Sequence, residues 1–442
     1  MHTYLKMKTY YNPSTDLWAE ISQRPANDIT ALFDVIRPIA QKVREEGDEA
    51  LKALELKFDN VKLESIAVCE EEMEKAADLI PASLKDSIKA AYENIKRFHE
   101  AQRFTPIEVE TAPGVVCQQR SVPIEKVGLY VPGGSAPLFS TVLMLAVPAQ
   151  IAGCKEIVLC TPPSRNPEDA CSVNPAILFA AKLCGITKVY KLGGAQAVFA
   201  MSYGTDSVVK VDKLFGPGNQ YVMAAKQLVS LQGVAIDMPA GPSEVEVIAD
   251  KSCVPAFVAA DLLSQAEHGP DSQVILCIRA ESKSEGEALA EAINTELESQ
   301  LAALPRKDIA LKALSSSRVV IFDSTENVMA FTNQYAPEHL IIATKDYNEL
   351  AQQVTCAGSV FLGNYACESA GDYASGTNHT LPTLGYARNY SGLCLDSFQR
   401  KMTLQTLSAE GIRSIGQTVV EMARAEQLDA HANAMKIRME MI

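Results

Sequence analysis

Short apolar runs with the composition of β-strands alternate with helical segments rich in small residues from about residue 127 onward, and this alternation constrains the fold most. It predicts βαβ units, in which parallel strands form a sheet and helices cover its faces. One series of runs ends before Gly241-Pro242 and a second follows, so we expect two α/β domains with a boundary there. The runs are residues 127–131, 157–160, 188–191, 234–237, 245–249, 273–277, 319–322, 339–343 and 358–362.

The segments on either side of this alternation have other patterns. Residues 1–28 are polar, lack sustained periodicity and indicate an N-terminal arm. Apolar residues at helical spacing predict helices within residues 29–58 and 71–98. The last fifty residues form a tail. Its helix over residues 416–427 is expected to break near Leu428-Asp429, because Asp429 can cap a second helix.

The size and charge of the chain restrict its class. At 442 residues it exceeds the length at which one hydrophobic core usually stops growing. The net charge of −14 argues against nucleic acid or an anionic membrane as a partner. The 11 cysteines contain no Cys-x-x-Cys and the start lacks an apolar signal-peptide core, which favours the cytoplasm. The uncharged run 135–153 contains Pro137 and Pro148, and we expect a buried helix there rather than a membrane span.

Histidine is scarce in this chain, and its placement indicates an active site. Of six histidines, four lie in the second half, each within a few residues of a carboxylate. Imidazole and carboxylate are the usual groups of transition-metal sites and of proton transfer at neutral pH. The four are His268, His339, His379 and His431.

Gln265 and His268 stand near the end of a helix that is predicted to begin at about Pro255 and to stop at Gly269-Pro270. Their i, i+3 spacing would place both on one face, where they could bind one metal ion. The alternative is a helix C-terminus at which histidine interacts favourably with the helix dipole. Glutamine is an unusual zinc ligand, so the spacing alone leaves both interpretations open.

Glu338 and His339 directly precede the apolar residues 340–342. Adjacent residues on a strand face opposite ways, so the backbone must still be a loop there if both side chains serve one site. Two adjacent proton acceptors suit a reaction with two proton transfers. The alternative is a strand edge with two solvated polar groups.

The segment 368–379 shows neither helical nor strand periodicity and is dense in polar groups, which predicts a loop. Loops that follow strands are where α/β domains usually build sites. Asp372 is the candidate ligand and His379 the candidate substrate contact, with a surface loop as the alternative. Glu426 and His431 flank the expected break in the tail, which could bring them together; a solvated helix face is the other interpretation.

Three glycine-rich segments are further candidates. Two of them precede helical patterns and could hold phosphate on backbone amides, although the Rossmann pattern G-x-G-x-x-G is absent. Ser243 follows the sharp turn at the expected boundary and could face the cleft between the domains. The glycine-rich segments are residues 131–135, 192–196 and 215–219.

Together and in this order, these segments resemble histidinol dehydrogenases. The resemblance runs from about Asp28 to Arg438, and so many collinear motifs are not expected by chance. The motifs are GLYVPGG from Gly128, KLGGAQA from Lys191, FGPGN from Phe215, MPAGPSE from Met238, SQAEHG from Ser264, APEHL from Ala336, ESAGDYASGTNH from Glu368 and AEQLDAHANA from Ala425.

The resemblance implies the last steps of histidine biosynthesis, in which L-histidinol is oxidised to L-histidinal and then to L-histidine with two NAD in sequence and one Zn²⁺ per subunit. His339 would be the general base, and Glu338 would activate water to hydrate the aldehyde. The zinc ligands, which would also contact substrate as His339 does, would be Gln265, His268, Asp372 and His431. Further substrate contacts would be Ser243, His379 and Glu426. The NAD contacts would be Tyr130, Gln196 and Asn219.

The resemblance also implies a fold of two Rossmann-like, aldehyde-dehydrogenase-like α/β domains with a C-terminal helical tail exchanged in a homodimer. His431 and Glu426 would then serve the site of the other subunit. The expected ranges are an N-terminal arm over 1–28, a domain with the metal and catalytic residues over 29–130 together with 244–390, an NAD-binding domain over 131–243 and a dimerisation tail over 391–442.

Three other functions compete with this one. A homologous NAD-dependent dehydrogenase could act on another polar alcohol, but the complete tail argues against it because Glu426 and His431 would serve the imidazole-bearing substrate. A zinc hydrolase would leave the glycine-rich segments unexplained. A non-catalytic metal-binding protein would leave the pair Glu338-His339 without a purpose.

Overall fold

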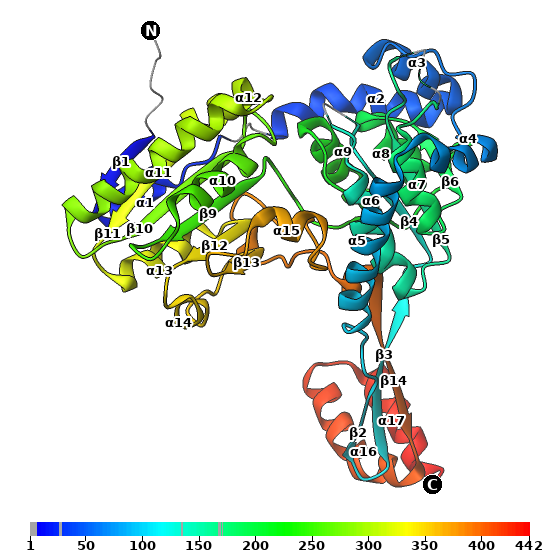
Figure 1. Ribbon diagram of the computed structural model, residues 1–442. Coiled ribbons are helices and arrows are strands. Elements are labelled where there is room, and N and C mark those ends of the chain that lie inside the picture. Colours follow the sequence, from blue (N-terminus) through cyan, green and yellow to red (C-terminus); the bar gives the residue numbers. More distant parts are fainter. Residues whose placement is uncertain (1–6, 26–28, 134–135, 167–168, 170) are drawn as a thin grey trace.

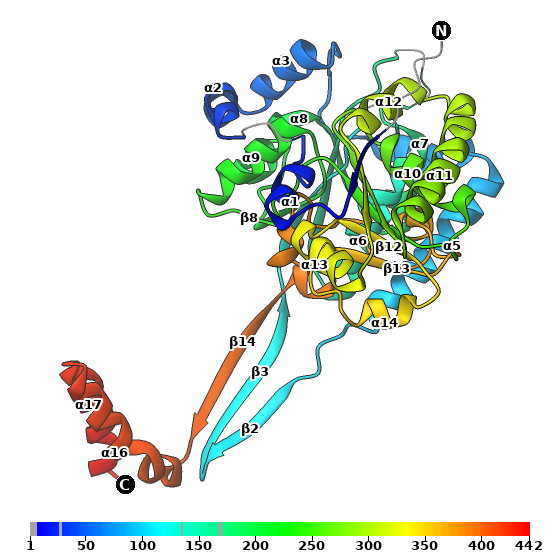
Figure 2. The ribbon, with the colours of Figure 1, turned by 90° about the vertical axis from the view of Figure 1, so that its left-hand side faces the viewer.

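A computed structural model describes residues 7–25, 29–133, 136–166, 169 and 171–442, which form two parallel sheets and one antiparallel sheet (Figure 1). The chain is therefore an α/β protein, as the alternation predicts, and each strand-like run contains a strand. The parallel sheets lie in two lobes, and the antiparallel sheet extends away from both (Figure 1 and Figure 2).

The five-stranded sheet is wholly parallel and has the order β6-β5-β4-β7-β8. Helices cover both faces, which is why its strands are apolar runs. Its strands are β4 (Lys126–Tyr130), β5 (Glu156–Thr161), β6 (Lys188–Lys191), β7 (Lys213–Phe215) and β8 (Ala235–Ile236). One face packs against α5 (Ala82–Glu100), α6 (Phe139–Ala152) and α7 (Pro175–Leu183). The other face packs against α2 (Phe33–Glu46), α3 (Asp48–Phe58), α8 (Gly194–Tyr203) and α9 (Gln220–Ser230). The short helix α4 (Glu70–Lys75) contacts α7.

The six-stranded sheet is also parallel, with the order β1-β11-β10-β9-β12-β13. Its strands are β1 (Lys8–Tyr11), β9 (Glu244–Ala249), β10 (Gln273–Arg279), β11 (Arg318–Phe322), β12 (His339–Ala343) and β13 (Ser359–Leu362). One face packs against α10 (Pro255–Ala266), α11 (Lys283–Ala303) and α12 (Lys307–Ser315). The other packs against α1 (Thr15–Ile21), α13 (Thr325–Tyr335) and α14 (Tyr347–Ala351). The short helix α15 (Glu368–Tyr373) contacts α10.

The antiparallel sheet has the order β14-β3-β2 and carries the end of the chain away from the lobes (Figure 2). β3 (Val115–Pro123) pairs with β14 (Gln399–Leu407) along its whole length, and β2 (Ile107–Ala112) pairs with β3. Two helices, α16 (Ala409–Ala425) and α17 (Asp429–Glu440), pack on each other at its far end. We call β2, β3, β14, α16 and α17 the extension. A break between the tail helices falls at residues 426–428, close to the predicted position, but the expected cap was wrong, because Asp429 is the first residue of α17 and Leu428 precedes it without a side-chain cap.

The packing differs from the expected grouping of residues 29–130 with residues 244–390. β4 is the central strand of the five-stranded sheet. Ile36 of α2 and Leu51 of α3 share a core with Val198 of α8. Which sheet an amphipathic helix covers depends on tertiary packing, and the periodicity of its sequence does not carry that information.

The expected N-terminal arm is also part of a core where it is described. β1 pairs with β11 at the edge of the six-stranded sheet, and Trp18 of α1 is buried edge-on against Phe322 and Phe331. Residues 1–6 and 26–28 of that expected arm lie outside the described residues.

The uncharged run over residues 135–153, apart from Ser135, lies within the described residues and contains α6. This helix is buried in the core of the five-stranded sheet, which explains its lack of a polar face. Within the part of the chain that the structure describes, no helix is long and apolar enough to cross a membrane.

Candidate active site

Three cavities that are connected through shared lining residues run from the five-stranded lobe to the six-stranded lobe. The first, of about 510 Å³, is lined by Tyr130, Gln196 and Asn219. The second, also of about 510 Å³, shares Asn219 and adds Ser243 and His268. Together they join the edge of the five-stranded sheet to the edge of the six-stranded sheet.

The third cavity, of about 140 Å³, lies at the six-stranded sheet. It shares Ser243 and His268 with the second, and its other predicted site residues are Glu338, His339, Asp372 and His379. Gln265 is fully buried in the last turn of α10. The structure thus places ten of the twelve predicted site residues in the two lobes, nine of them lining these cavities, and it leaves out Glu426 and His431.

The residues on the five-stranded side lie where its strands end. Tyr130 is the last residue of β4, Gln196 lies in the first turn of α8 after β6, and Asn219 caps α9 after β7. Parallel strands end at one edge, where open α/β sheets bind their ligands. The Asn219 Oδ1 accepts from the N–H groups of Tyr221 and Val222, so its amide nitrogen points to no partner among the described residues.

A glycine-specific turn brings two of these side chains together. Gly194 has φ +59, a region that favours glycine, and its N–H donates to the Tyr130 hydroxyl over 3.0 Å. Beside it, the Gln196 Nε2 donates to the buried Glu55 carboxylate over 2.8 Å, and the Gly193 N–H donates to the same oxygen over 2.9 Å. The turn after β6 is therefore held in one conformation.

Glu338 and His339 lie at the amino end of β12, and both are only 4% exposed. Glu338 precedes the strand and His339 begins it, so the two side chains can line one cavity although adjacent strand residues diverge. This agrees with the expectation that the backbone is not yet a strand at Glu338. The His339 Nδ1 lies 3.6 Å from the Glu338 Oε2, and its Nε2 lies 3.6 Å from the Asp372 Oδ1.

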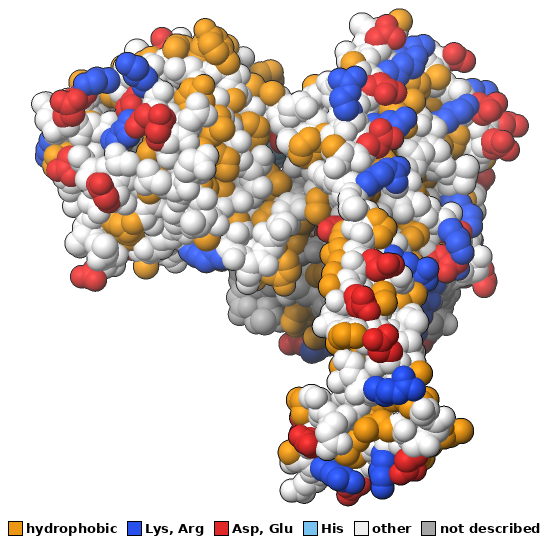
Figure 3. All heavy atoms as spheres, turned by 90° about the horizontal axis from the view of Figure 1, so that it is seen from below, with side chains coloured by type: hydrophobic (Ala, Val, Ile, Leu, Met, Phe, Trp, Pro, Cys, Tyr) orange, Lys and Arg blue, Asp and Glu red, His pale blue; other side chains and the backbone are white. Residues whose placement is uncertain are grey.

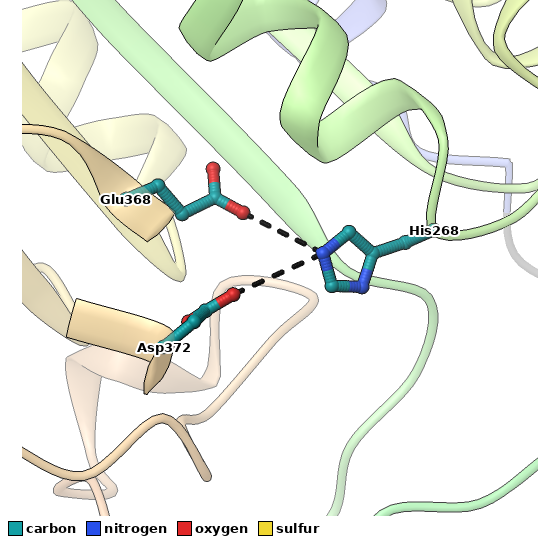
Figure 4. Close-up of side chains that lie close together, drawn as sticks. All are labelled: His268, Glu368 and Asp372. Atoms are coloured by element: carbon teal, nitrogen blue, oxygen red, sulfur yellow. Dashed lines mark ion pairs between the residues drawn. The ribbon is translucent and has the colours of Figure 1, made fainter. Parts of the chain in front are cut away.

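A cluster that can hold a cation consists of His268, Glu368 and Asp372 (Figure 4). Their ligand atoms all lie within 4.8 Å of one another. The His268 Nε2 is 3.8 Å from the Glu368 Oε1 and 3.9 Å from the Asp372 Oδ2. Nitrogen and oxygen donors at this spacing suit Zn²⁺.

Two local expectations about these residues were wrong. Residues 368–373 form the helix α15 rather than a loop, so Glu368 and Asp372 are at i, i+4 on one face. Sequence reasoning missed Glu368, because its spacing from Asp372 indicates a shared face only once the helix is known. The helix α10 ends at Ala266 rather than at Gly269-Pro270, so His268 lies in the following turn, where its N–H donates to the Gln265 carbonyl over 3.2 Å.

Buried polar atoms without partners mark this cluster as a site for a ligand. Among the described residues, both side-chain polar atoms of Gln265 and both carboxylate oxygens of Glu368 are buried without a hydrogen bond. Burying such groups unpaired costs about 1–3 kcal/mol each. A cation bound by Gln265, His268 and Asp372 would satisfy the glutamine oxygen and offset the carboxylates, so the residues present fit Zn²⁺.

The electrostatics also favour a bound cation. Burial raises the pKa of Glu368 to about 8 and that of Asp261, on α10, to about 7. Burial opposes a charged His339, but the carboxylates of Glu368 and Glu338 outweigh it and raise the pKa of His339 well above its usual value. A divalent cation beside Glu368 would cancel part of that charge and let His339 serve as a base.

His379 connects the site to the other lobe. Its Nδ1 lies 3.0 Å from the backbone oxygen of Asp372, and its Nε2 lies 3.3 Å from the hydroxyl of Thr141 on α6. Burial lowers the pKa of His379, which keeps its ring neutral. A neutral ring can donate one hydrogen bond and accept another.

The two remaining predicted residues lie on the extension. Glu426 ends α16 and His431 lies in α17, and both are exposed. Neither lines any of the three cavities, so a single chain does not bring them to the other ten.

Known proteins match this chain along nearly its whole length, and the matches name one family. A family model described as histidinol dehydrogenase matches residues 22–439. A histidinol dehydrogenase from Bacteroides thetaiotaomicron is 57% identical over 433 residues, 98% of this chain and 99% of the relative. Another from Vibrio vulnificus is 55% identical over 425 residues, 95% of each. The crystal structure of histidinol dehydrogenase from Elizabethkingia anophelis matches with a TM-score of 0.95 at 50% identity, covering 100% of this chain and 99% of that one.

Proposed function

The chain belongs to the histidinol dehydrogenase family, and on that premise we propose that it oxidises L-histidinol through L-histidinal to L-histidine with two NAD in sequence. One observation carries the proposal. The cavities join Tyr130, Gln196 and Asn219 at one sheet to the pair Glu338-His339 at the other. A dehydrogenase of this kind needs a dinucleotide-binding surface next to proton-accepting side chains. The residues that line the connected cavities are of the types that suit both roles.

We place Zn²⁺ on Gln265, His268 and Asp372, with His431 of a second copy as the fourth ligand. When bound, the ion supplies a Lewis-acidic centre that fixes the imidazole and amine of the substrate and keeps positions open for them. Ser243, His379 and Glu426 complete the substrate contacts. Glu368 is buried with its Oε1 3.8 Å from the same His268 Nε2 that faces Asp372, so its carboxylate could also contact the ion.

The two proton acceptors divide the chemistry. His339 takes the proton of the substrate hydroxyl while the hydride leaves for NAD. Glu338 then removes a proton from water, which adds to the aldehyde before the second hydride transfer. Both side chains are buried, so few water molecules compete for either transfer. The edge of Tyr130, Gln196 and Asn219 holds the dinucleotide.

We propose further that the enzyme is a homodimer in which the extension of one chain completes the site of the other. The far end of the extension has a small core, made of Val420, Ala423 and Ala432 with two partly buried methionines. It also exposes the apolar side chains of Val109, Met402, Met422, Ile437 and Met441. Figure 3 shows apolar side chains on the surface of the projecting part. So small a core is marginal by itself, and contact with a second copy would cover it.

The cytoplasm is the compartment we propose, because all 11 cysteines are free and five of them are buried.

The test is the ratio of products. Purified enzyme with Zn²⁺, limiting L-histidinol and excess NAD should form two NADH for each histidinol consumed, with L-histidine as the product. One NADH with accumulating aldehyde would sink the four-electron proposal. Faster turnover of an alcohol without imidazole would favour the competing dehydrogenase of another polar alcohol.

A further inference from the structure

We infer that Arg24 is a positioning residue for Glu338 and acts through the carboxylate of Glu244. Arg24 lies in the N-terminal segment after α1, far in sequence from both carboxylates. No family motif quoted above contains it. The inference rests on the proposed role of Glu338 in the second oxidation.

Arg24 makes a bidentate ion pair that is buried inside the protein. Its Nε and Nη2 donate to the two oxygens of Glu244, the Nη2 over 2.7 Å. The side chains of Arg24 and Glu244 are 13% and 1% exposed. The guanidinium also lies over the ring of Tyr335, 4.1 Å from its centroid. Bidentate and stacked contacts of this kind need arginine, because lysine has neither the fork nor the plane.

This ion pair contacts two segments that lie next to Glu338, namely the end of α13, which precedes it in the chain, and the start of β9, which is hydrogen-bonded to it. The Arg24 Nη2 donates to the carbonyl of Tyr335, the last residue of α13, over 2.6 Å. Glu244 begins β9, and its N–H donates to the Glu338 Oε2 over 2.9 Å. One guanidinium therefore ties the end of α13 to the start of β9, and Glu338 lies between these two points.

The backbone before Glu338 needs such a restraint. Ala336 ends α13 with φ +51, in the left-handed region that non-glycine residues rarely adopt. This turn directs Pro337 and Glu338 into the site. The Arg24 bond to the carbonyl of Tyr335, immediately before the turn, removes one route by which the strain could relax.

Charge supports the same role. Glu244 is buried close to Glu338, which disfavours its ionised form, and ionised Glu244 in turn raises the pKa of Glu246. Arg24 is the cation that balances this group. Without it, an uncompensated carboxylate would stand next to Glu338.

The experiment compares the two oxidations in three variants. The first step is measured as formation of the first NADH from L-histidinol in a single turnover, and the second as turnover of L-histidinal, which requires only that step. Arg24→Gln should lower kcat for histidinal at least about tenfold, lower the first step several-fold less, and leave KM for NAD within about twofold. Glu338→Gln is the reference and should show the same selectivity with a larger loss. Arg24→Lys keeps the charge and should fall between Arg24→Gln and the parent.

The matched control is Arg279→Gln. Arg279 is also a bidentate, partly buried arginine in the six-stranded sheet, where it pairs with Asp346 and Asp250 at the opposite ends of the strands. Its loss should lower stability without changing the ratio of the two rates. An equal loss in both steps for Arg24→Gln, as for a purely structural defect, would overturn the inference.

A second measurement separates this inference from the proposed function. If Glu338→Gln shows no selective loss in the second step, the proposed role of Glu338 fails. The crystal structure of the Arg24→Lys or Arg24→Gln protein then decides the positioning claim by itself. A displaced or disordered Glu338 side chain supports it, and an unmoved one refutes it.

Discussion

The predicted site residues in the lobes differ from those on the extension in burial and in hydrogen bonding. Among the described residues, the lobes bury polar side chains and leave several of their atoms without hydrogen-bond partners, as in Gln265 and Glu368. The extension exposes Glu426 and His431 beside only a small core. The lobes therefore contain buried polar groups that lack partners, and the extension contains polar side chains that are exposed. The proposed exchange of the extension between two copies would account for this difference, because the exposed residues of one chain would join the buried ones of the other.

The largest effect is expected inside the lobes, at His339. The variant His339→Ala removes the proposed base at the amino end of β12, so kcat should fall by about 10²–10⁴. Its zinc content should stay near one ion per chain, because His339 is not a proposed ligand. Steady-state rates and metal analysis check both. Turnover close to that of the parent would show that the chemistry is not in this lobe.

A smaller effect should appear at the other end of the connected cavities. Tyr130→Phe removes the hydroxyl that accepts from the Gly194 N–H, one hydrogen bond worth about 0.5–1.5 kcal/mol. KM for NAD should rise by about three- to tenfold with little change in kcat, since the turn after β6 loses its anchor.

The matched control for that variant is Tyr190→Phe. Tyr190 is also buried, and its hydroxyl accepts from the Val209 N–H, but it lines none of the three cavities. KM for NAD should therefore be unchanged in the control. An equal rise of KM for NAD in both variants would show that Tyr130 has no specific part in binding the dinucleotide.

The smallest effect concerns stability alone. Burial raises the pKa of Glu246, on β9, to about 8, so the folded state holds a proton that the unfolded chain releases above its ordinary value of 4.5. The folded state binds more protons in this window, and stability falls as pH rises from about 4.5 to 8.

Glu246→Gln keeps the acceptor for Thr332 and does not titrate. Its free energy of unfolding should exceed that of the parent by on the order of 2 kcal/mol near pH 8, and the difference should vanish near pH 5. Urea unfolding at several pH values measures this. A constant difference across pH would show that Glu246 is ionised throughout.

Local pattern explains how much of the fold could be predicted. The βαβ runs were found because buried parallel strands are continuous apolar segments. The strands β2 and β14 were missed because they are exposed and polar, and β7 because it has only three residues. The grouping of residues 29–130 with the sheet of residues 244–390 was wrong, because periodicity identifies the apolar face of a helix but not the sheet against which that face packs.

The site shows the same limit. The motifs identified His268, Asp372 and the pair Glu338-His339 through the resemblance. Glu368 was missed because six residues of α15 are too few to show a period. Arg24 was missed because its partner Glu244 lies 220 residues away, and nothing local in sequence connects them.

The most direct test of the comparison between lobes and extension is complementation in mixed dimers. His431→Ala chains and His339→Ala chains should each be inactive as homodimers. In a verified heterodimer, one site combines an intact lobe from the first chain with an intact extension from the second. We predict recovery to about half of the parent activity per dimer, because one of two sites is complete. Heterodimers that stay inactive would contradict the exchange of the extension and, with it, the assignment of His431 to the partner's site.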